Sequence, residues 1–477
     1  MKSLRVRFAP SPTGYLHIGN ARTALFNYLF ACQDGGSLVL RIEDTDPTRS
    51  SSDFEKAIFE DLRWLSIRWD EGPDTGGKYG PYRQSLRQGL YREYAEELLR
   101  KGKVYKCFCS PEELEQMRKS LLARSQMPRY DGRCRNLSPR EVERFEEEGR
   151  RSTLRFKVEG TSIPFGDMIH GELSFEAGSI GDFVILRSDG MAAYNFACVI
   201  DDAAMKISHV IRGDDHLPNT PKQLLLYEAL GVVPPQFAHH PLILGADRTP
   251  LSKRHGDTAV RHYREKGYLA EALNNYLVLL GWTPHKGKEI LSIVELTEAF
   301  RLEKLSRGAP VFDLKKLQWV NSQHMRNASV ESLSQLVVPF LPEKTVLGEA
   351  RLHRVIRAVR DNLQNLSQIK NHVELFTDQP VAMDPEALET LNTSKAVEVI
   401  SEMRDLLRGC DRITEETCYR LLEELRHKFR IGAKGLMMPL RAAITGKTHG
   451  PELVKILALL DRETILRRLD HALEGRK

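Results

Sequence analysis

Two short segments of this chain carry residues that could act on a phosphorylated nucleotide. The first is His17-Ile-Gly-Asn20, which follows the conformationally restricted run Ala9-Pro-Ser-Pro-Thr-Gly14. The second is Pro250-Leu-Ser-Lys-Arg-His-Gly256, in which Lys253 and Arg254 are adjacent. Neutral and cationic donors of these types can stabilise the negative charge that develops on phosphorus during phosphoryl chemistry. Each segment alone also fits an ordinary turn or a solvated pair of charges, but their joint presence favours a nucleotide site.

A strand and a helix are expected on either side of the first segment. Residues 4–8 alternate apolar side chains with arginine, as an edge strand does, and the prolines and glycine of residues 10–14 then interrupt the strand. Asn20 can cap the helix that follows. A strand that leads through a tight loop into a helix N-terminus presents free N–H groups and a positive dipole end, which suits phosphate. The inner face of the helix would be formed by Ala21, Ala24, Leu25, Tyr28 and Leu29.

Strand-like and helix-like stretches alternate along the first half of the chain, which predicts a parallel α/β sheet. Apolar residues recur at helical spacing after about residue 247, so the C-terminal third is predicted to be all-helical, with Asp461 as one helix cap. The strand-like runs lie at residues 37–42, 182–186, 194–200 and 209–212, and the helical patterns lie at 57–65, at 90–99 before Gly102, and at 223–227.

Composition excludes several classes of protein. The chain has 477 residues, which predicts more than one domain, and no apolar run is long enough to cross a membrane. The start Met-Lys-Ser-Leu-Arg enters the first strand without a signal segment, so we expect a cytoplasmic protein. Of the seven cysteines three fall close together and four are scattered, which is no disulfide framework. The net charge of +5 is too small to indicate nucleic-acid binding by itself.

A series of motifs makes the chain similar to the class I aminoacyl-tRNA synthetases, and specifically to the bacterial-type glutamyl-tRNA synthetases. His17-Ile-Gly-Asn20 and Leu251-Ser-Lys-Arg254 resemble the two signature motifs of that class. The resemblance covers nearly the whole chain. The other motifs that resemble the family, in its order, are Arg7-Phe-Ala-Pro-Ser-Pro-Thr-Gly14, Leu40-Arg-Ile-Glu-Asp-Thr-Asp46, Tyr194-Asn-Phe-Ala197, Val199-Ile-Asp-Asp202, His209-Val-Ile-Arg-Gly-Asp-Asp-His216, Pro310-Val-Phe-Asp-Leu314 and Pro439-Leu-Arg-Ala-Ala-Ile-Thr-Gly446.

The resemblance implies an α/β protein with a Rossmann-type class I synthetase catalytic domain and an α+β insertion that binds the acceptor arm. A helical stem-contact region and all-α anticodon-binding domains would follow. The expected boundaries are 1–82 and 187–248 for the two halves of the catalytic domain, 83–186 for the insertion, 249–325 for the stem-contact domain, and 326–385 and 386–477 for the two anticodon-binding domains.

The resemblance also implies the activation of L-glutamate by ATP, with Mg²⁺ accompanying the triphosphate. The catalytic residues would be His17, Asn20 and Lys253, which are all present in the sequence. Pro250 stands where the family often has lysine, which removes one cation and stiffens the start of the loop. The implied ATP-binding residues are Ala9, Pro10, His17, Gly19, Asn20, Leu251, Ser252, Lys253 and Arg254.

Recognition of glutamate calls for arginine, because a guanidinium group can grip a carboxylate with two hydrogen bonds. Taken alone, Arg7 also fits a solvated strand arginine, and Glu43 fits one member of an acidic turn. His216 and Cys198 match positions beside the family's pocket, where its members vary. In the family, two arginines bind the side chain of glutamate and three residues hold its amino-acid end. The residues that match them are Arg7, Arg212, Ser11, Glu43 and Tyr194.

A cysteine cluster lies within the expected insertion. Cys107, Cys109 and Cys134, with Tyr130, resemble the zinc-binding form of this insertion, in which three thiolates and a tyrosine oxygen complete a tetrahedral site. Soft ligands in a segment with little core make a structural Zn²⁺ reasonable. A Cys-x-Cys pair also occurs in proteins without metal.

The implied partner of the enzyme, expected to be a monomer, is tRNA(Glu), which would have to be bound before glutamate is activated efficiently. Four arginines spaced three apart, at residues 351–360, could face phosphates or form a solvated helix face. Asn362 stands where family members restricted to tRNA(Glu) often have arginine, so charging of tRNA(Gln) is open. Two alternatives are a glutamyl transferase that acts on a modified tRNA base and a non-catalytic tRNA-binding paralogue. The first generally lacks anticodon domains, and the second would be favoured by loss of His17 or Lys253.

Overall fold

The computed structural model describes residues 4–33, 35–46, 48–284, 287–343, 347–377 and 381–474, and the side chain of Lys253 lies outside this description. The chain forms two compact units. Unit 1 comprises Met1–His262 and Leu273–Asp313, and unit 2 comprises Tyr263–Ala272 and Leu314–Lys477. No helix among the described residues is both long enough and apolar enough to span a membrane.

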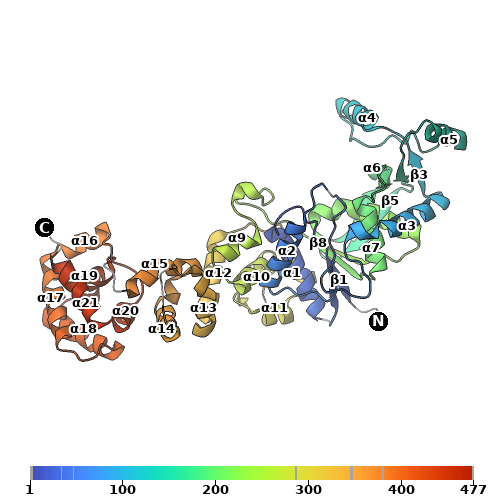
Figure 1. Cartoon of the computed structure of the whole chain (residues 1–477). Helices are drawn as coiled ribbons and strands as arrows, with labels where there is room; N and C mark the ends of the chain where they lie inside the picture. The colour runs from blue at the N-terminus through green and yellow to red at the C-terminus, as the bar shows by residue number, and fades with distance from the viewer. Residues whose placement is uncertain are drawn as a thin grey trace. The chain divides into compact units, whose positions relative to one another are not determined.

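Unit 1 holds all the strands of the described chain, and some of its helices, such as the one at residues 18–33, pack against them (Figure 1). Its strands are β1 (Arg5–Phe8), β2 (Ser37–Leu40), β3 (Val104–Cys107), β4 (Thr153–Phe156), β5 (Ser162–Asp167), β6 (Gly171–Glu176), β7 (Phe183–Leu186), β8 (His209–Gly213) and β9 (Gln236–His240). The helices lying wholly within it are α1 (Ile18–Gln33), α2 (Ser52–Trp64), α3 (Gln88–Arg100), α4 (Pro111–Ala123), α5 (Pro139–Glu147), α6 (Ala177–Ile180), α7 (Tyr194–Ala204), α8 (Thr220–Leu230) and α11 (Ile293–Ala299).

The predicted parallel α/β pairing is confirmed. Strands β1 and β2 are parallel, and β8 and β9 are parallel within a four-stranded sheet of order β6-β5-β9-β8. Strands β3, β4 and β7 form a separate antiparallel sheet. Strand β5, which lies in the segment expected to be an insertion, is therefore a neighbour of β9 in the four-stranded sheet.

The predicted strand at residues 194–200 is wrong, because this segment begins helix α7. Every residue from Phe196 to Asp202 is buried. A helix buried all round shows no amphipathic period, and its run of apolar residues resembles a buried strand. Sequence periodicity alone therefore could not distinguish the two structures at this position.

The predicted role of Asn20 as a helix cap is also wrong. Helix α1 begins at Ile18, so Asn20 already lies in its first turn. The residue before the helix is His17, and its Nδ1 accepts a hydrogen bond from the backbone N–H of Gly19 at 3.0 Å. An imidazole acceptor thus satisfies one of the N–H groups that the first turn leaves free.

Strand β1 is not a solvated edge, because all four of its residues are buried. Its arginines are paired instead with carboxylates. Arg5 donates to Glu71 at 2.9 Å, and the Nε of Arg7 lies 3.3 Å from Oδ1 of Asp202. The two arginines that alternate with apolar residues in β1 therefore form ion pairs in the interior.

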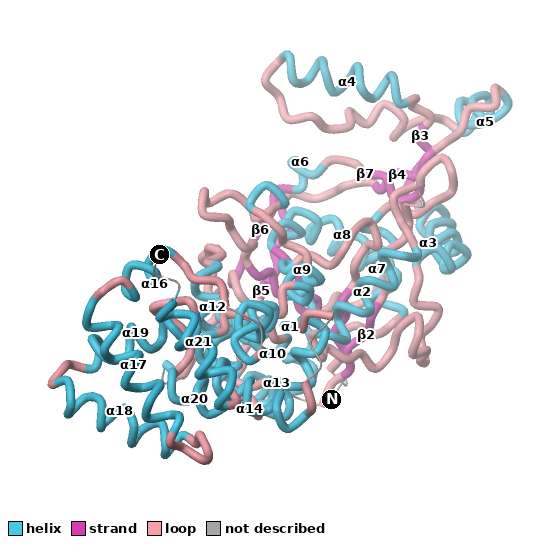
Figure 2. Tube along the Cα trace, turned by 60° about the vertical axis from the view of Figure 1, so that its left-hand side comes forward, coloured by secondary structure: helices cyan, strands magenta, loops and turns pink. Residues whose placement is uncertain are grey.

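Unit 2 is all-helical throughout its described residues, as predicted, and the tube in Figure 2 shows no strand there. The predicted cap is confirmed, because Oδ1 of Asp461 accepts from the N–H of Thr464 at 2.8 Å. Its helices are α12 (Leu314–Asn327), α13 (Val330–Val337), α14 (Glu349–Val359), α15 (Lys370–Val373), α16 (Pro385–Leu391), α17 (Ser394–Arg408), α18 (Glu415–Phe429), α19 (Ala433–Thr445), α20 (Leu453–Leu459) and α21 (Arg462–Glu474). Helices α9 (Val260–Glu265) and α10 (Ala270–Leu279) each contribute residues to both units.

The predicted arginine stripe is divided in the structure. Arg354 and Arg357 are exposed on α14. Arg351 donates to the carbonyl of Phe376 at 2.8 Å, and Arg360 donates to a backbone carbonyl at 3.4 Å. Two of the four cations are therefore used in packing within unit 2.

Candidate active site

A cavity of about 540 Å³ opens in unit 1 beside the carboxyl ends of β1, β8 and β9 and the first turn of α1. Ligands of open α/β sheets bind at this edge, outside the carboxyl ends of the strands. The lining residues are Arg7, Phe8, Ala9, Pro10, Ser11, Thr13, His17, Gly19, Asn20, Arg22, Thr23, Glu43, Tyr194, Ile211, Arg212, Gly213, Asp215, His216, Asn219, His240, Leu242, Ile243, Pro250 and Leu251.

This one cavity brings together most of the site residues expected from the sequence. The five residues expected to bind glutamate all line it, as do six of those expected to bind ATP. Ser252 and Arg254 do not line it, and the side chain of Lys253 lies outside the described structure. The lining residues that were expected to bind ATP are Ala9, Pro10, His17, Gly19, Asn20 and Leu251.

His17 combines a structural and a chemical property. Burial lowers the pKa of His17, so the ring is neutral at pH 7. Because its Nδ1 accepts from the N–H of Gly19, the proton of the neutral ring is on Nε2. His17 therefore offers one N–H donor beside the positive end of α1, where an anion would be stabilised.

The second motif is joined to the first by backbone hydrogen bonds. The N–H of Ile18 donates to the carbonyl of Thr258 at 2.9 Å, and the N–H of Val260 donates to the carbonyl of Leu16 at 2.9 Å. The segment that follows the Ser-Lys-Arg loop is thus paired with the segment that carries His17. This pairing brings together two motifs that are far apart in the sequence.

Polar contacts shape the loop itself. The N–H of Ser252 donates to Nδ1 of His255 at 3.0 Å, and Nε2 of His255 lies 3.0 Å from Asp247. Arg254 is exposed and donates to the hydroxyl of Thr249. In this conformation the guanidinium group of Arg254 is directed into the loop's own hydrogen bonds.

One end of the cavity is strongly charged. Asp202 pairs with Arg41 at 2.6 Å and with Arg7, while Arg41 also donates to Glu43 at 3.0 Å. Burial alone would lower the pKa of Arg7, but the carboxylate of Asp202, together with smaller contributions from Cys198 and Tyr194, raises it. Burial raises the pKa of Glu43, against the opposing effect of Arg41. Arg7 and Glu43 are thus held in place by ion pairs from behind.

These contacts exclude the simpler interpretations of Arg7 and Glu43. Arg7 is 4% exposed and Glu43 is 7% exposed, so neither is a solvated surface charge. Cys198 lies behind the cavity and not in its lining, with its thiol 3.6 Å from Asp202. Burial raises the pKa of Cys198 to about 12, so the thiol stays neutral.

Arg212 is held by three neighbours and keeps one nitrogen free of partners. Its Nη2 donates to Thr220 and to Gln223, both at 2.9 Å, and its Nε donates to Nε2 of His239 at 3.0 Å. Its Nη1 is buried without a hydrogen-bond partner in the described structure. A guanidinium nitrogen of this kind is suited to an anionic ligand.

Tyr194 and His216 form a pair at the same end of the cavity. The hydroxyl of Tyr194 lies 3.0 Å from Nδ1 of His216. Burial lowers the pKa of His216 to about 4, and the nearby Arg212 adds to this effect. His216, which the sequence placed only near the pocket, is therefore a neutral lining residue.

Sequence reasoning missed the lining residues Arg22, Thr23 and His240. Thr23 Oγ1 lies 2.9 Å from Nε2 of His240, and Nη2 of Arg22 lies 3.2 Å from its Nδ1. Burial lowers the pKa of His240 well below its usual value, and the cation of Arg22 lowers it further. Arg22 stands two residues after Asn20 within an otherwise apolar helix pattern, and this was the available signal.

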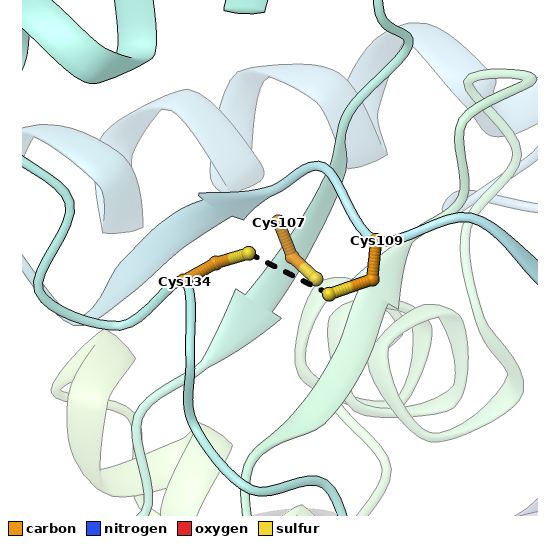
Figure 3. A group of neighbouring side chains, drawn as sticks. All are labelled: Cys107, Cys109 and Cys134. Carbon is orange, nitrogen blue, oxygen red and sulfur yellow. Dashed lines mark hydrogen bonds between the residues drawn. The ribbon is translucent and has the colours of Figure 1, made fainter. Parts of the chain in front are cut away.

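The cysteine cluster lies apart from the cavity, at the end of β3. The sulfur atoms of Cys107, Cys109 and Cys134 all lie within 4.8 Å of one another and point inward (Figure 3). The Sγ atoms of Cys109 and Cys134 are 3.6 Å apart. The hydroxyl oxygen of Tyr130 is 3.4 Å from Sγ of Cys107 and 3.6 Å from Sγ of Cys109. The four residues predicted to bind a metal are therefore side by side.

The family follows from comparison with known proteins. Residues 3–319 match the family described as "tRNA synthetases class I (E and Q), catalytic domain", and residues 332–473 match the anticodon binding domain. Since the first match alone covers more than half of the chain, the chain belongs to the class I tRNA synthetases and has the fold of their catalytic domain.

Individual relatives narrow the assignment. Glutamate–tRNA ligase 1 of Caldicellulosiruptor saccharolyticus is 49% identical over 476 residues, which cover 98% of each chain. The glutamate–tRNA ligase of Carboxydothermus hydrogenoformans is 48% identical over 474 residues, covering 98% of this chain and 99% of that one. A crystal structure of a glutamate tRNA ligase from Elizabethkingia meningosepticum, in complex with its amino acid, is 34% identical with a TM-score of 0.91, and the match covers 100% of both chains. The chain belongs to the glutamate–tRNA ligase family.

Because His240 is neutral in the folded protein, the free energy of unfolding should depend on pH. Below about pH 6.5 the unfolded chain binds a proton on this histidine, whereas the folded chain does not bind one until a much lower pH. Stability that is present at neutral pH is therefore lost as the pH falls. His240→Leu should reduce the loss of unfolding free energy between pH 7 and pH 5 by about 2 kcal/mol. Denaturant titrations at the two pH values measure this loss.

Tryptophan fluorescence suits this measurement, because Trp64, Trp69 and Trp282 all lie in unit 1. The exposed His427 on α18 offers a control, since His427→Gln should leave the pH dependence unchanged. An unaltered pH dependence in His240→Leu would contradict a neutral buried His240.

Proposed function

We propose that this chain activates L-glutamate with ATP and then transfers the glutamyl group to the terminal adenosine of tRNA(Glu). The observation that carries the proposal is that one cavity has two kinds of anion site. Its lining includes two buried guanidinium groups, of Arg7 and Arg212, and also the first turn of α1 with His17. Such a cavity can hold a dicarboxylate and a triphosphate together.

At the glutamate end, Arg7 and Arg212 would bind the side-chain carboxylate through charge-assisted hydrogen bonds. Ser11, Glu43 and Tyr194 would hold the α-amino and α-carboxyl groups. Burial raises the pKa of Tyr194, so its hydroxyl is a neutral hydrogen-bonding group. The fixed arrangement of charges supports this assignment, because Arg7 and Glu43 are both tied to the same Arg41–Asp202 pair.

At the ATP end, the reaction needs orientation and charge neutralisation and no covalent nucleophile. The α-carboxylate of glutamate attacks the α-phosphorus of ATP, and diphosphate leaves. His17 and Asn20 would donate to the phosphates, and Ala9, Pro10, Gly19 and Leu251 would shape the nucleotide site. Mg²⁺ would accompany the triphosphate, and it commonly binds through phosphates and waters without a dedicated acidic cage.

We assign the Ser252–Arg254 loop to the same phosphates. Lys253 would neutralise charge in the transition state, and Ser252 and Arg254 would assist it. Arg254 is engaged with Thr249 and Asp247, so the loop has to rearrange before this guanidinium reaches a ligand. Pro250 lines the cavity at the start of the loop, where it limits that rearrangement.

The tRNA would contact the insertion at residues 83–186, the stem-contact region at 249–325 and the helical domains at 326–385 and 386–477. Arg354 and Arg357 are the exposed cations that support a phosphate contact on α14. The match to an anticodon binding domain disfavours the alternative of a transferase for a modified base. The presence of His17 in the cavity disfavours a non-catalytic paralogue. The monomeric state stays a prediction.

We propose a structural Zn²⁺ at the cysteine cluster. A tetrahedral ion with bonds of about 2.3 Å to sulfur would separate two sulfur atoms by about 3.8 Å. The observed separation of 3.6 Å between Cys109 and Cys134 fits this geometry. The oxygen of Tyr130 already faces two of the sulfurs and would serve as the fourth ligand, with Cys107 completing the set. The ion would stabilise an insertion whose helices α4 and α5 bury no residue.

The function is tested by aminoacylation of purified tRNA(Glu) and tRNA(Gln) with labelled glutamate. We expect ATP-dependent charging of tRNA(Glu). The exposed Asn362 offers an amide where an arginine would add charge and bulk at the anticodon, so tRNA(Gln) is the informative second substrate. If neither tRNA is charged, the proposed function is overturned. The ratio of the two charging rates gives the tRNA specificity.

Lys253→Ala should slow glutamate-dependent ATP–diphosphate exchange by at least about 100-fold, because a cation is removed from the transition state. The affinity for tRNA should stay nearly constant, as measured by filter binding. Lys101→Ala removes an exposed lysine at the end of α3 and is the matched control. Near-normal exchange in Lys253→Ala would show that the loop does not act on the phosphates.

Elemental analysis of the purified protein should give about one zinc per chain. Cys109→Ser should lose most of that metal, because a thiolate ligand is replaced by a weakly binding hydroxyl. Cys32→Ser, at an exposed cysteine outside the cluster, should retain it. Far less than one zinc in the unaltered protein would exclude the site.

A further inference from the structure

Three buried polar residues stand on three neighbouring strands behind the cavity. Asp167 ends β5, His239 is in β9, and Arg212 is in β8. Arg212 and His239 are partners in the parallel register of β8 and β9. The side chains of Asp167 and His239 have no exposed surface, and Arg212 is 4% exposed. The three residues thus form one buried row that ends in the lining of the cavity.

Hydrogen bonds determine where the proton of His239 resides. Its Nε2 receives a hydrogen bond from Nε of Arg212 at 3.0 Å, and a guanidinium group can only donate. Nε2 is therefore unprotonated, and the ring proton is on Nδ1. Nδ1 lies 2.7 Å from Oδ2 of Asp167 and donates to it. The row runs from a carboxylate through a neutral imidazole to a guanidinium group.

Other contacts hold Asp167 rigidly. Its Oδ1 accepts from the N–H groups of Ile169 and His170, both at 2.9 Å, and its Oδ2 also accepts from the N–H of His239 at 3.1 Å. Burial lowers the pKa of His239 to about 4, which agrees with a neutral ring. The backbone of the β5–β6 turn thereby holds the carboxylate of Asp167 in place, and this carboxylate in turn orients the ring of His239.

The contacts of Arg212 leave one direction open. Thr220 and Gln223 occupy Nη2, and His239 occupies Nε, so the guanidinium plane is defined by side chains from α8 and β9. Nη1 is the nitrogen without a partner in the described structure. A planar group gripped on two of its nitrogens presents the third in a fixed direction.

We propose that His239 and Asp167 are positioning residues that orient Arg212 for the side-chain carboxylate of the amino-acid substrate. The inference rests on the proposed function, in which Arg212 binds that carboxylate. His239 supplies the acceptor that sets the guanidinium plane, and Asp167 fixes the tautomer that makes His239 an acceptor. Neither residue lines the cavity or touches the substrate.

A positioning role has a specific kinetic consequence. The side-chain carboxylate of glutamate does not react, so its grip is the same in the ground state and the transition state. Loss of that grip raises the KM for glutamate and leaves kcat and the KM for ATP nearly unchanged. General damage to the fold would affect both substrates.

His239→Phe tests the proposal, because phenylalanine fills the volume but cannot accept from Arg212. We expect the KM for glutamate in tRNA-dependent ATP–diphosphate exchange to rise by about 10-fold or more, the usual effect of losing a charged hydrogen bond. The KM for ATP should change by less than about 2-fold. If His239→Phe does not fold, His239→Met, with its adaptable side chain, provides the same comparison.

His239→Gln provides the rescue. Its amide oxygen can accept from Arg212 while its amide nitrogen donates to Asp167, so the KM for glutamate should return to within about 3-fold of normal. His209→Gln, at the start of β8 and outside the cavity, is the matched control and should match the unaltered protein.

The outcomes separate the two hypotheses. Absence of glutamate-dependent exchange in the unaltered protein would reject the proposed function itself. Normal exchange with an unchanged glutamate KM in His239→Phe, or with equal rises for glutamate and ATP, would reject the positioning role alone. A KM for glutamate that is no lower in His239→Gln than in His239→Phe would also reject the positioning role.

Discussion

The structure depends on the neutralisation of arginines buried inside unit 1. A guanidinium group removed from water is costly unless carboxylates and hydrogen-bond acceptors surround it. Helix α7 provides two of these carboxylates: Asp202 pairs with Arg7 and Arg41, and Asp201 pairs with Arg87 at 2.6 Å. Because α7 is buried, β1 and the cavity are tied to a helix that cannot shift without separating these charges. The positive charge that Arg7 presents to the cavity is therefore fixed before any ligand binds.

Much of this arrangement could be predicted from the sequence. The strand before His17, the helix after it, the parallel pairing and the helical C-terminal region each have a local signal in apolar spacing and turn residues. Residues 194–200 were predicted incorrectly, because a helix buried on every side shows no amphipathic period. Asn20 was predicted as a cap because its residue type is typical of caps, whereas the ring of His17 accepts that hydrogen bond.

The features that could not be predicted from the sequence depend on contacts between distant parts of the chain. The spacing of residues in β1 is the same whether Arg7 faces water or Asp202, which is 195 residues away. No local pattern indicates that His240 meets Thr23, or that His239 lies between Asp167 and Arg212. The proton positions of His17 and His239 follow only from the donors around each ring. Such contacts arise from sheet order, and one sequence without its fold contains little information about them.

The position of β5 in the four-stranded sheet limits which fragments of this protein can be made. By its position in the sequence, the segment from residue 83 to residue 186 resembles a removable module. Yet β5 is a neighbour of β9, and the carbonyl of Phe237 in β9 accepts from the N–H of Met168 at 2.8 Å. Excision of the whole segment would expose one side of β9 and remove Asp167 from beside His239. A truncated protein meant to keep the cavity intact would therefore have to retain the β5–β6 hairpin, and a fragment without the rest of residues 83–186 would be discontinuous.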